Sequence, residues 1–137
     1  MLNYSRHLAR LILTTNRPRL NAARNEIWLV NFDPTYGDEI QKTRPAVIIN
    51  IGAAFRHRLR IVVPITSWQS KFEQDFWMIR LPANPTNGLD NESAANAFQV
   101  KSLSEERFVR KIGVLDNALM DEITTAIALC IGYNPFQ

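Results

Sequence analysis

From residue 26 onward the chain carries short runs of β-branched and aromatic residues, each ended by turn-forming residues. Such runs are typical of β-strands, because branched and aromatic side chains pack well on a pleated surface. The pattern predicts strands at residues 26–32, 45–51, 60–65, 75–81 and 95–100. In the second run residues 46–49 are all apolar, which indicates a strand that is covered on both faces. Short strands separated by turns predict a small antiparallel barrel.

Near the C-terminus the apolar residues change to a spacing of four. Leu119, Ile123, Ile127 and Ile131 recur at this interval, as on one face of an α-helix. Asp116 is a suitable N-cap for such a helix, and Gly132 is a suitable C-cap. The pattern therefore predicts an amphipathic helix between these two residues.

Residues 102–108 suit one or two helical turns, with Ser102 and Glu105 at the spacing of a capping box. No internal repeat or low-complexity segment is present. With the strands and the terminal helix, this segment completes a prediction of the α+β class. The predicted architecture is a curved antiparallel sheet with a C-terminal helix packed on it.

Residues 1–24 differ from the rest of the chain. They are polar, broken by Pro18 and poor in apolar positions, so we predict a basic N-terminal extension followed by one domain at residues 25–137. Whether residues 8–13 form a short helix against the domain is left open by the sequence. The extension holds five arginines and no acid, whereas the domain holds more acids than bases. The net charge of +3 is therefore weak evidence for a nucleic-acid surface.

Cys130 is the only cysteine, so the chain cannot form an internal disulfide. Its apolar neighbours predict a buried, unreactive thiol. A chain without disulfides suits the reducing cytoplasm, which is the location that we expect. No run of about 18 apolar residues is present, so no transmembrane helix is expected.

Several kinds of catalytic centre are disfavoured by the sequence. The only histidines, His7 and His57, are far apart and lack ligand spacing, so neither a metal nor another cofactor is expected. His57 lies between Arg56 and Arg58, where a solvated charged loop is a better interpretation than acid–base catalysis. No Gly-x-Ser-x-Gly motif is present, which argues against a serine hydrolase.

A polar loop at residues 37–45 brings Lys42 and Arg44 to the start of a buried strand. A guanidinium is planar, permanently charged and offers paired donors, so it can neutralise a phosphodiester as negative charge develops. The alternative is a structural salt bridge from Arg44 to Asp33 or Glu39, and the residues alone do not choose between the two.

Thr66 and Ser67 follow an apolar run at the end of the third predicted strand. Their hydroxyls could donate to phosphate or orient a ribose 2′-OH, or they could simply cap the strand. Residues 40–72 contain no acid but several cations: Lys42, Arg44, Arg56, Arg58, Arg60 and Lys71. These cations form either a local positive surface for nucleic acid or an ordinary solvated face.

Several segments, in order, resemble the MazF/PemK family. They are residues 26–39 (Glu-Ile-Trp-Leu-Val-Asn-Phe-Asp-Pro-Thr-Tyr-Gly-Asp-Glu), 42–49 (Lys-Thr-Arg-Pro-Ala-Val-Ile-Ile) and 63–66 (Val-Pro-Ile-Thr), then 88–89, Ser93, 98–100, 111–113 and the final helix. The resemblance implies a homodimeric SH3-like barrel that cleaves single-stranded messenger RNA without metal or cofactor. It also implies a bacterial or archaeal cytoplasmic toxin that a cognate antitoxin silences.

The resemblance also assigns roles to residues. Arg44 matches the family's catalytic arginine and Thr66 its catalytic threonine, while Ser93 and Gln99 match positions that contact RNA. Lys42 and Ser67 flank the catalytic pair along the chain, and we expect both to bind RNA. The chain departs from the family pattern at Asn25, where glycine is usual, and at Tyr36, where arginine is frequent. Tyr36 could stack on a base, because aromatic side chains do so in single-strand recognition.

Two other functions fit the same fold. A gyrase poison would bind protein and perform no chemistry, but such proteins end in Trp-Gly-Ile and lack the Lys-Thr-Arg-Pro segment, whereas this chain ends in Tyr-Asn-Pro-Phe-Gln. A non-catalytic RNA-binding barrel would keep the positive surface without cleaving.

Overall fold

The computed structural model describes residues 20–52 and 58–137. The helix considered for residues 8–13, together with His7, Arg56 and His57, lies outside these residues. The strands are β1 (Glu26–Asn31), β2 (Thr43–Ile48), β3 (Leu59–Ser67), β4 (Met78–Leu81), β5 (Ser93–Asn96), β6 (Lys101–Ser104) and β7 (Phe108–Val114). They are joined by the 3-10 turns η2 (Ser70–Gln74), η3 (Ala97–Gln99) and η4 (Glu105–Arg107), and the chain continues in α2 (Asn117–Cys130).

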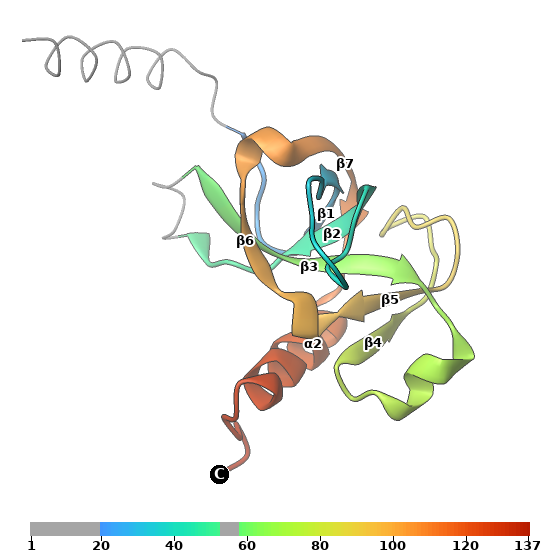
Figure 1. Cartoon of the computed structure of the whole chain (residues 1–137). Helices are drawn as coiled ribbons and strands as arrows, with labels where there is room; N and C mark the ends of the chain where they lie inside the picture. The colour runs from blue at the N-terminus through green and yellow to red at the C-terminus, as the bar shows by residue number, and fades with distance from the viewer. Residues whose placement is uncertain (1–19, 53–57) are drawn as a thin grey trace, which may run out of the picture.

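Strand β3 organises the antiparallel sheet, because its two halves pair with different neighbours. Residues 62–64 of β3 pair with β2, residues 59–62 pair with β6, and residues 65–67 pair with β5. The order along the sheet is β4-β5-β3-β2-β1-β7. Figure 1 shows the strands curving around a common centre, with α2 below β5. The expected α+β class and barrel-like antiparallel sheet are confirmed.

Successive side chains of the central strands point to opposite faces of the sheet, and each face contributes to one of two hydrophobic cores. Val47, Val63 and Ile65 join one core with Met120 and Ile123 of α2. The neighbouring residues on the other face form the second core, which includes Val30, Ala46, Ile48, Val62, Leu103 and Phe108. Because β2 contributes to both cores, the prediction that its apolar run is covered on both faces is confirmed.

Helix α2 begins where the sequence predicts. The Asp116 carboxylate accepts a hydrogen bond from the Leu119 amide at 2.9 Å, which satisfies one of the free donors of the first turn. The predicted apolar face is wrong at its end, because Ile131 lies beyond the last helical residue and is exposed. Cys130 is only partly buried, contrary to the expected burial, although burial raises the pKa of its thiol.

The remaining differences lie where turns interrupt apolar runs. The fourth strand begins at Met78 rather than at residue 75, because the Met78 amide donates to the Asp75 carbonyl in a turn. The fifth is β5, which ends at Asn96, where η3 begins. The capping box at residues 102–105 is wrong: residues 101–104 form β6, and Ser104 caps the single turn η4. Strand β7 was not predicted, because its residues 109–111 are all exposed and do not alternate between apolar and polar side chains.

Candidate active site

The sheet brings Arg44 of β2 close to Thr66 of β3. The pairing of β2 with β3 ends at Ala46 and Pro64, and Arg44 and Thr66 each lie two residues beyond that pair. Residues two apart on a strand share a face, so both side chains lie on the side of Ala46, at the rim of the second core. The Arg44 Nη1 atom is 3.5 Å from Thr66 Oγ1, across 22 residues of sequence.

The guanidinium of Arg44 forms no ion pair within the described residues. Its Nε donates to the Gln41 carbonyl at 3.1 Å. The two carboxylates considered as partners are used elsewhere: Asp33 accepts from the Lys42 amide at 2.9 Å, and Glu39 pairs with Lys101 at 3.5 Å. The alternative of a structural salt bridge at Arg44 is therefore wrong.

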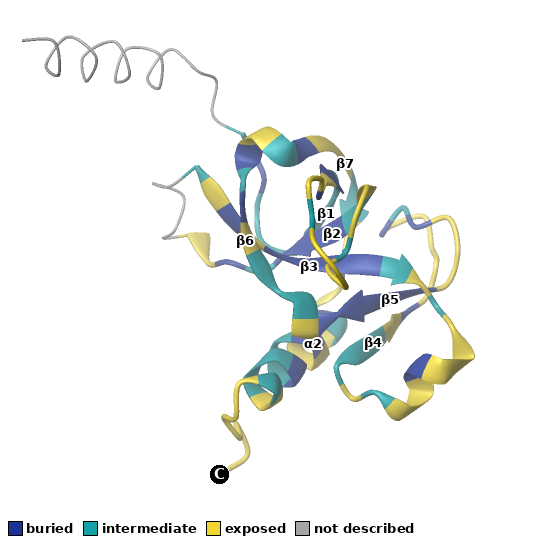
Figure 2. Ribbon diagram, in the orientation of Figure 1, coloured by how far each residue is buried: buried dark blue, intermediate teal, exposed yellow. Residues whose placement is uncertain are grey.

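A loop at residues 33–42 borders the Arg44–Thr66 pair, and Gln99 holds it. The side-chain oxygen Oε1 of Gln99 accepts from the Ile40 amide at 2.7 Å, and the side-chain nitrogen Nε2 donates to the Asp38 carbonyl at 3.3 Å. Lys42 has a positive φ of 68° at the end of the loop. Tyr36 is 81% exposed and available for stacking. Figure 2 shows this loop mostly in yellow between β1 and β2.

The two serines lie on the other face of the sheet. Ser67 and Ser93 pair with each other between β3 and β5, one residue out of step with Thr66. Successive side chains alternate between faces, so neither shares the face of Thr66. The Ser93 hydroxyl is buried and donates to the Asn91 carbonyl at 2.9 Å, whereas Ser67 is exposed.

The predicted cationic surface is smaller than the sequence suggests. Arg60 is 1% exposed and donates at 3.0 Å to the carbonyls of Leu20 and Ala22, which fastens the segment before β1. Arg58 pairs with Glu105 at 2.5 Å. These two arginines therefore stabilise the fold, whereas Lys42 and Lys71 are exposed.

Arg80 of β4 was not anticipated from the sequence. Ala94 pairs with both Thr66 and Arg80, so these three residues form a row across one face of the part of the sheet made by β3, β5 and β4. The Arg80 guanidinium lies 4.7 Å from the centroid of the Trp68 ring. The hydrogen bond from Arg80 lowers the pKa of the Glu92 carboxyl. In the sequence, the alternation of apolar and polar residues from 76 to 80 was the pattern that could have shown on which face of the strand Arg80 lies.

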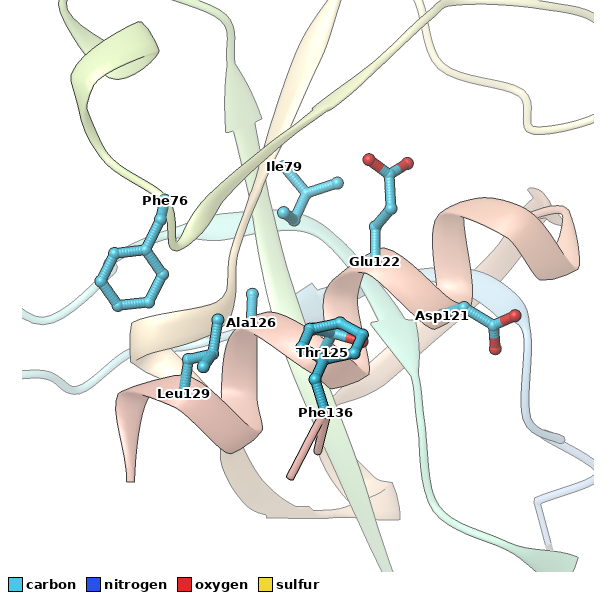
Figure 3. Close-up of a pocket in the computed structure, with 8 residues that line it drawn as sticks. All are labelled: Phe76, Ile79, Asp121, Glu122, Thr125, Ala126, Leu129 and Phe136. Carbon is cyan, nitrogen blue, oxygen red and sulfur yellow. The ribbon is translucent and has the colours of Figure 1, made fainter. Parts of the chain in front are cut away.

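A separate cavity of about 360 Å³ lies between β4 and α2. It is lined by Phe76, Ile79, Asp121, Glu122, Thr125, Ala126, Leu129 and Phe136 (Figure 3). Ile79 pairs with Ala95, one residue out of step with Arg80, so the cavity lies on the face opposite Thr66. The lining is mostly apolar, and none of the residues that line the cavity offers a second catalytic group to work with the carboxylates of Asp121 and Glu122.

Within the described residues, no three His, Cys, Asp or Glu side chains lie together as metal ligands would. In the same part of the chain, no helix is long and apolar enough to cross a membrane.

Comparisons with known proteins agree on one family. The model of the family described as "PemK-like, MazF-like toxin of type II toxin-antitoxin system" matches residues 23–131. The chain is 34% identical over 112 residues to Endoribonuclease MazF9 of Mycobacterium tuberculosis, covering 77% of this chain and 92% of that protein.

Two solved structures share the fold. The crystal structure of MazF from Deinococcus radiodurans superposes with a TM-score of 0.69 at 22% identity, covering 84% of this chain and 99% of that one. A mycobacterial endoribonuclease, solved in complex with its cognate antitoxin, has a TM-score of 0.59 at 20% identity, with 83% and 97% covered.

Proposed function

Because the chain belongs to the PemK-like, MazF-like toxin family of type II toxin-antitoxin systems, we propose that it is an endoribonuclease that cleaves single-stranded messenger RNA without metal. The observation that carries the proposal is the pairing of Arg44 and Thr66 on one face, 3.5 Å apart, with no carboxylate of the described residues neutralising the arginine. An unneutralised guanidinium beside a hydroxyl is suited to bind a phosphodiester.

The chemistry is an in-line attack within the RNA. The ribose 2′ oxygen forms a bond to the adjacent phosphorus as the bond from phosphorus to the 5′ oxygen breaks, and the product is a 2′,3′-cyclic phosphate. Arg44 neutralises the charge that develops on the phosphoryl oxygens, and Thr66 orients one of these oxygens or the attacking hydroxyl. Neither residue is a base at neutral pH, so the proton of the 2′ hydroxyl passes to another acceptor, and the leaving 5′ oxygen takes up a proton to become a hydroxyl.

The RNA path follows from the surroundings of this pair. Lys42 supplies an exposed cation next to Arg44, and Tyr36 supplies an exposed ring on which a base can stack. Gln99 holds the loop that carries both residues. Ser67 and Ser93 were also expected to bind RNA, but they lie on the face opposite Thr66. Because the buried Ser93 hydroxyl is already donated to the Asn91 carbonyl, exposed Ser67 is the better proposed RNA contact of the two.

The partners follow from the family. We propose that a cognate antitoxin binds and silences the toxin, and that the active form is a cytoplasmic homodimer. The mycobacterial endoribonuclease was solved in complex with its cognate antitoxin, which supports the first part of this proposal. In the proposed organisation residues 25–137 are the catalytic domain and residues 1–24 a basic extension.

Cleavage of a long messenger RNA by the purified chain, in excess chelator, tests this function. We expect cuts at a short recurring sequence, with cyclic phosphate or its hydrolysed form at the new 3′ ends. Binding without cuts would instead identify a non-catalytic RNA-binding barrel. Inhibition of gyrase with intact RNA would identify a gyrase poison.

A further inference from the structure

Asn96 at the end of β5 is a buried side chain whose amide oxygen has no hydrogen-bond partner. It is 7% exposed, and among the described residues no donor lies within reach of its Oδ1 atom. The other buried asparagines differ. Asn50 accepts from the Ile61 amide at 3.1 Å, and Asn87 accepts from the amides of Asn84 and Leu89 at 3.2 and 3.0 Å. An unpaired buried amide lowers stability, so a buried asparagine that no hydrogen bond explains suggests a use in binding.

The register places Asn96 on the face of the proposed catalytic pair. Ala94 pairs with Thr66 on β3, and Asn96 follows Ala94 by two residues on the same strand. Residues that pair, or that lie two apart, share a face, so Asn96 neighbours Thr66 diagonally across the sheet. The turn η3 then leads from Asn96 to Gln99, which holds the loop beside Arg44. Figure 2 shows β5 in dark blue beside β3.

Among ligands at this position, a nucleobase fits the unpaired amide best. A phosphate oxygen cannot donate a hydrogen bond, so it cannot satisfy Oδ1. An exocyclic amino group can, and single-stranded RNA is read by hydrogen bonds to base edges that have left the stack. Adenine, cytosine and guanine carry such an amino group on their Watson–Crick edge. Uracil offers only a ring N–H, which lies between two carbonyl oxygens that repel an approaching amide oxygen.

We propose that Asn96 is a specificity-determining residue: its amide binds the base of a nucleotide flanking the cleaved bond and selects a base with an exocyclic amino group (adenine, cytosine or guanine) over uracil there. This inference rests on the proposed ribonuclease function. One satisfied hydrogen bond to a base edge changes discrimination by roughly tenfold or more. Removing the amide should therefore change which RNA is cut rather than whether RNA is cut.

The test compares Asn96→Leu with the wild-type chain on oligonucleotides that differ only at the two nucleotides flanking the cut. We expect wild type to cleave substrates with an amino-bearing base (adenine, cytosine or guanine) at one of these positions roughly tenfold faster than substrates with uracil there. In Asn96→Leu this ratio should fall to near one while cleavage persists. Asn96→Asp keeps the acceptor oxygens, so it should retain the ratio even where its charge slows all substrates.

A matched control separates a binding role from a structural one. Asn87→Leu removes an amide that makes hydrogen bonds, so its melting temperature should fall, whereas that of Asn96→Leu should stay level or rise. If Asn96→Leu cleaves RNA and its ratio of cleavage rates between the flanking bases is unchanged, the inference is wrong while the proposed ribonuclease function stands. Destabilisation matching Asn87→Leu, or a changed oligomeric state, would assign the amide to the fold or to a second copy, and also overturn it. Failure of wild type to cut any RNA would overturn the proposed function itself, and the inference with it.

Discussion

At the scale of single residues, the proposed chemistry depends on how two side chains are presented. Arg44 and Thr66 each lie two residues beyond the last β2–β3 pair, so both are carried by strands and not by flexible loops. The sequence identified both residues through the family resemblance. It could not show that Arg60 is buried, because arginines of the core and of the surface have the same local pattern until the carbonyls that receive them are placed.

Replacing Thr66 by valine tests the hydroxyl, since valine keeps the shape of the side chain. We expect the cleavage rate to fall by roughly a hundredfold, because a group that orients the reacting phosphate is lost. The melting temperature should change little. Thr86→Val, in an exposed turn away from the site, is the matched control and should keep the wild-type rate. Equal rates for the two variants would reduce Thr66 to a strand residue.

At the scale of elements, the long strands and the terminal helix were predictable, because their apolar periodicity reflects burial that the structure confirms. Strands β6 and β7 were not. In β7 residues 109–111 are exposed, so the alternation that marks a half-buried strand is missing. The β1–β2 loop was recognised as a loop, but its attachment to Gln99 spans 59 residues of sequence and leaves no local signal.

Gln99→Ala tests whether this side chain holds the loop at residues 33–42. Loss of both hydrogen bonds should speed hydrogen exchange at the Ile40 amide by about tenfold or more, because about 1 kcal/mol or more of local stability is lost. The RNA affinity should fall as the loop loosens, while the melting temperature changes little. Unchanged Ile40 exchange together with weaker RNA binding would show instead that Gln99 acts only by touching RNA.

Glu26 joins β1 to β7 and makes stability depend on pH. Burial raises the pKa of its carboxyl, but hydrogen bonds from Trp28, the Ala23 amide and Lys111 outweigh burial and leave the pKa below its usual value of 4.5. A lowered pKa stabilises the fold above about pH 4.5, and this contribution is lost as pH falls through the folded value. Glu26→Gln should therefore unfold more easily at pH 7, by about 1–2 kcal/mol.

Thermal unfolding of wild type and Glu26→Gln across pH 3 to 7 checks this, since protonation of Glu26 in the wild type should bring the two curves together at the acid end, below roughly pH 4. A gap between the curves that stays constant over this range would mean that the charge of Glu26 contributes nothing.

At the scale of the whole molecule, charge decides how partners compete. RNA binds by releasing counterions from its phosphates, so an antitoxin that covers the same surface needs comparable negative charge. Two of the sequence's candidate cations, Arg58 and Arg60, are excluded as members of that surface by their structural roles. Lys42, exposed beside Arg44, is the better probe.

Lys42→Glu should weaken RNA and antitoxin binding together, by roughly tenfold each at low salt, because it reverses a charge beside the proposed phosphate site. Arg110→Glu makes the same change at an exposed position of β7 and should affect both much less. Titrations at several salt concentrations measure this. Loss of RNA binding with antitoxin affinity intact would show that the antitoxin uses another surface.

The central claim is that Arg44 stabilises the transition state of RNA cleavage, and single-turnover cleavage of one oligonucleotide in excess chelator tests it most directly. Wild type should cut it and leave a 2′,3′-cyclic phosphate. Arg44→Ala should fold with a melting temperature near that of the wild type and cut at least roughly a hundredfold more slowly. Cleavage by folded Arg44→Ala at the wild-type rate would contradict the account.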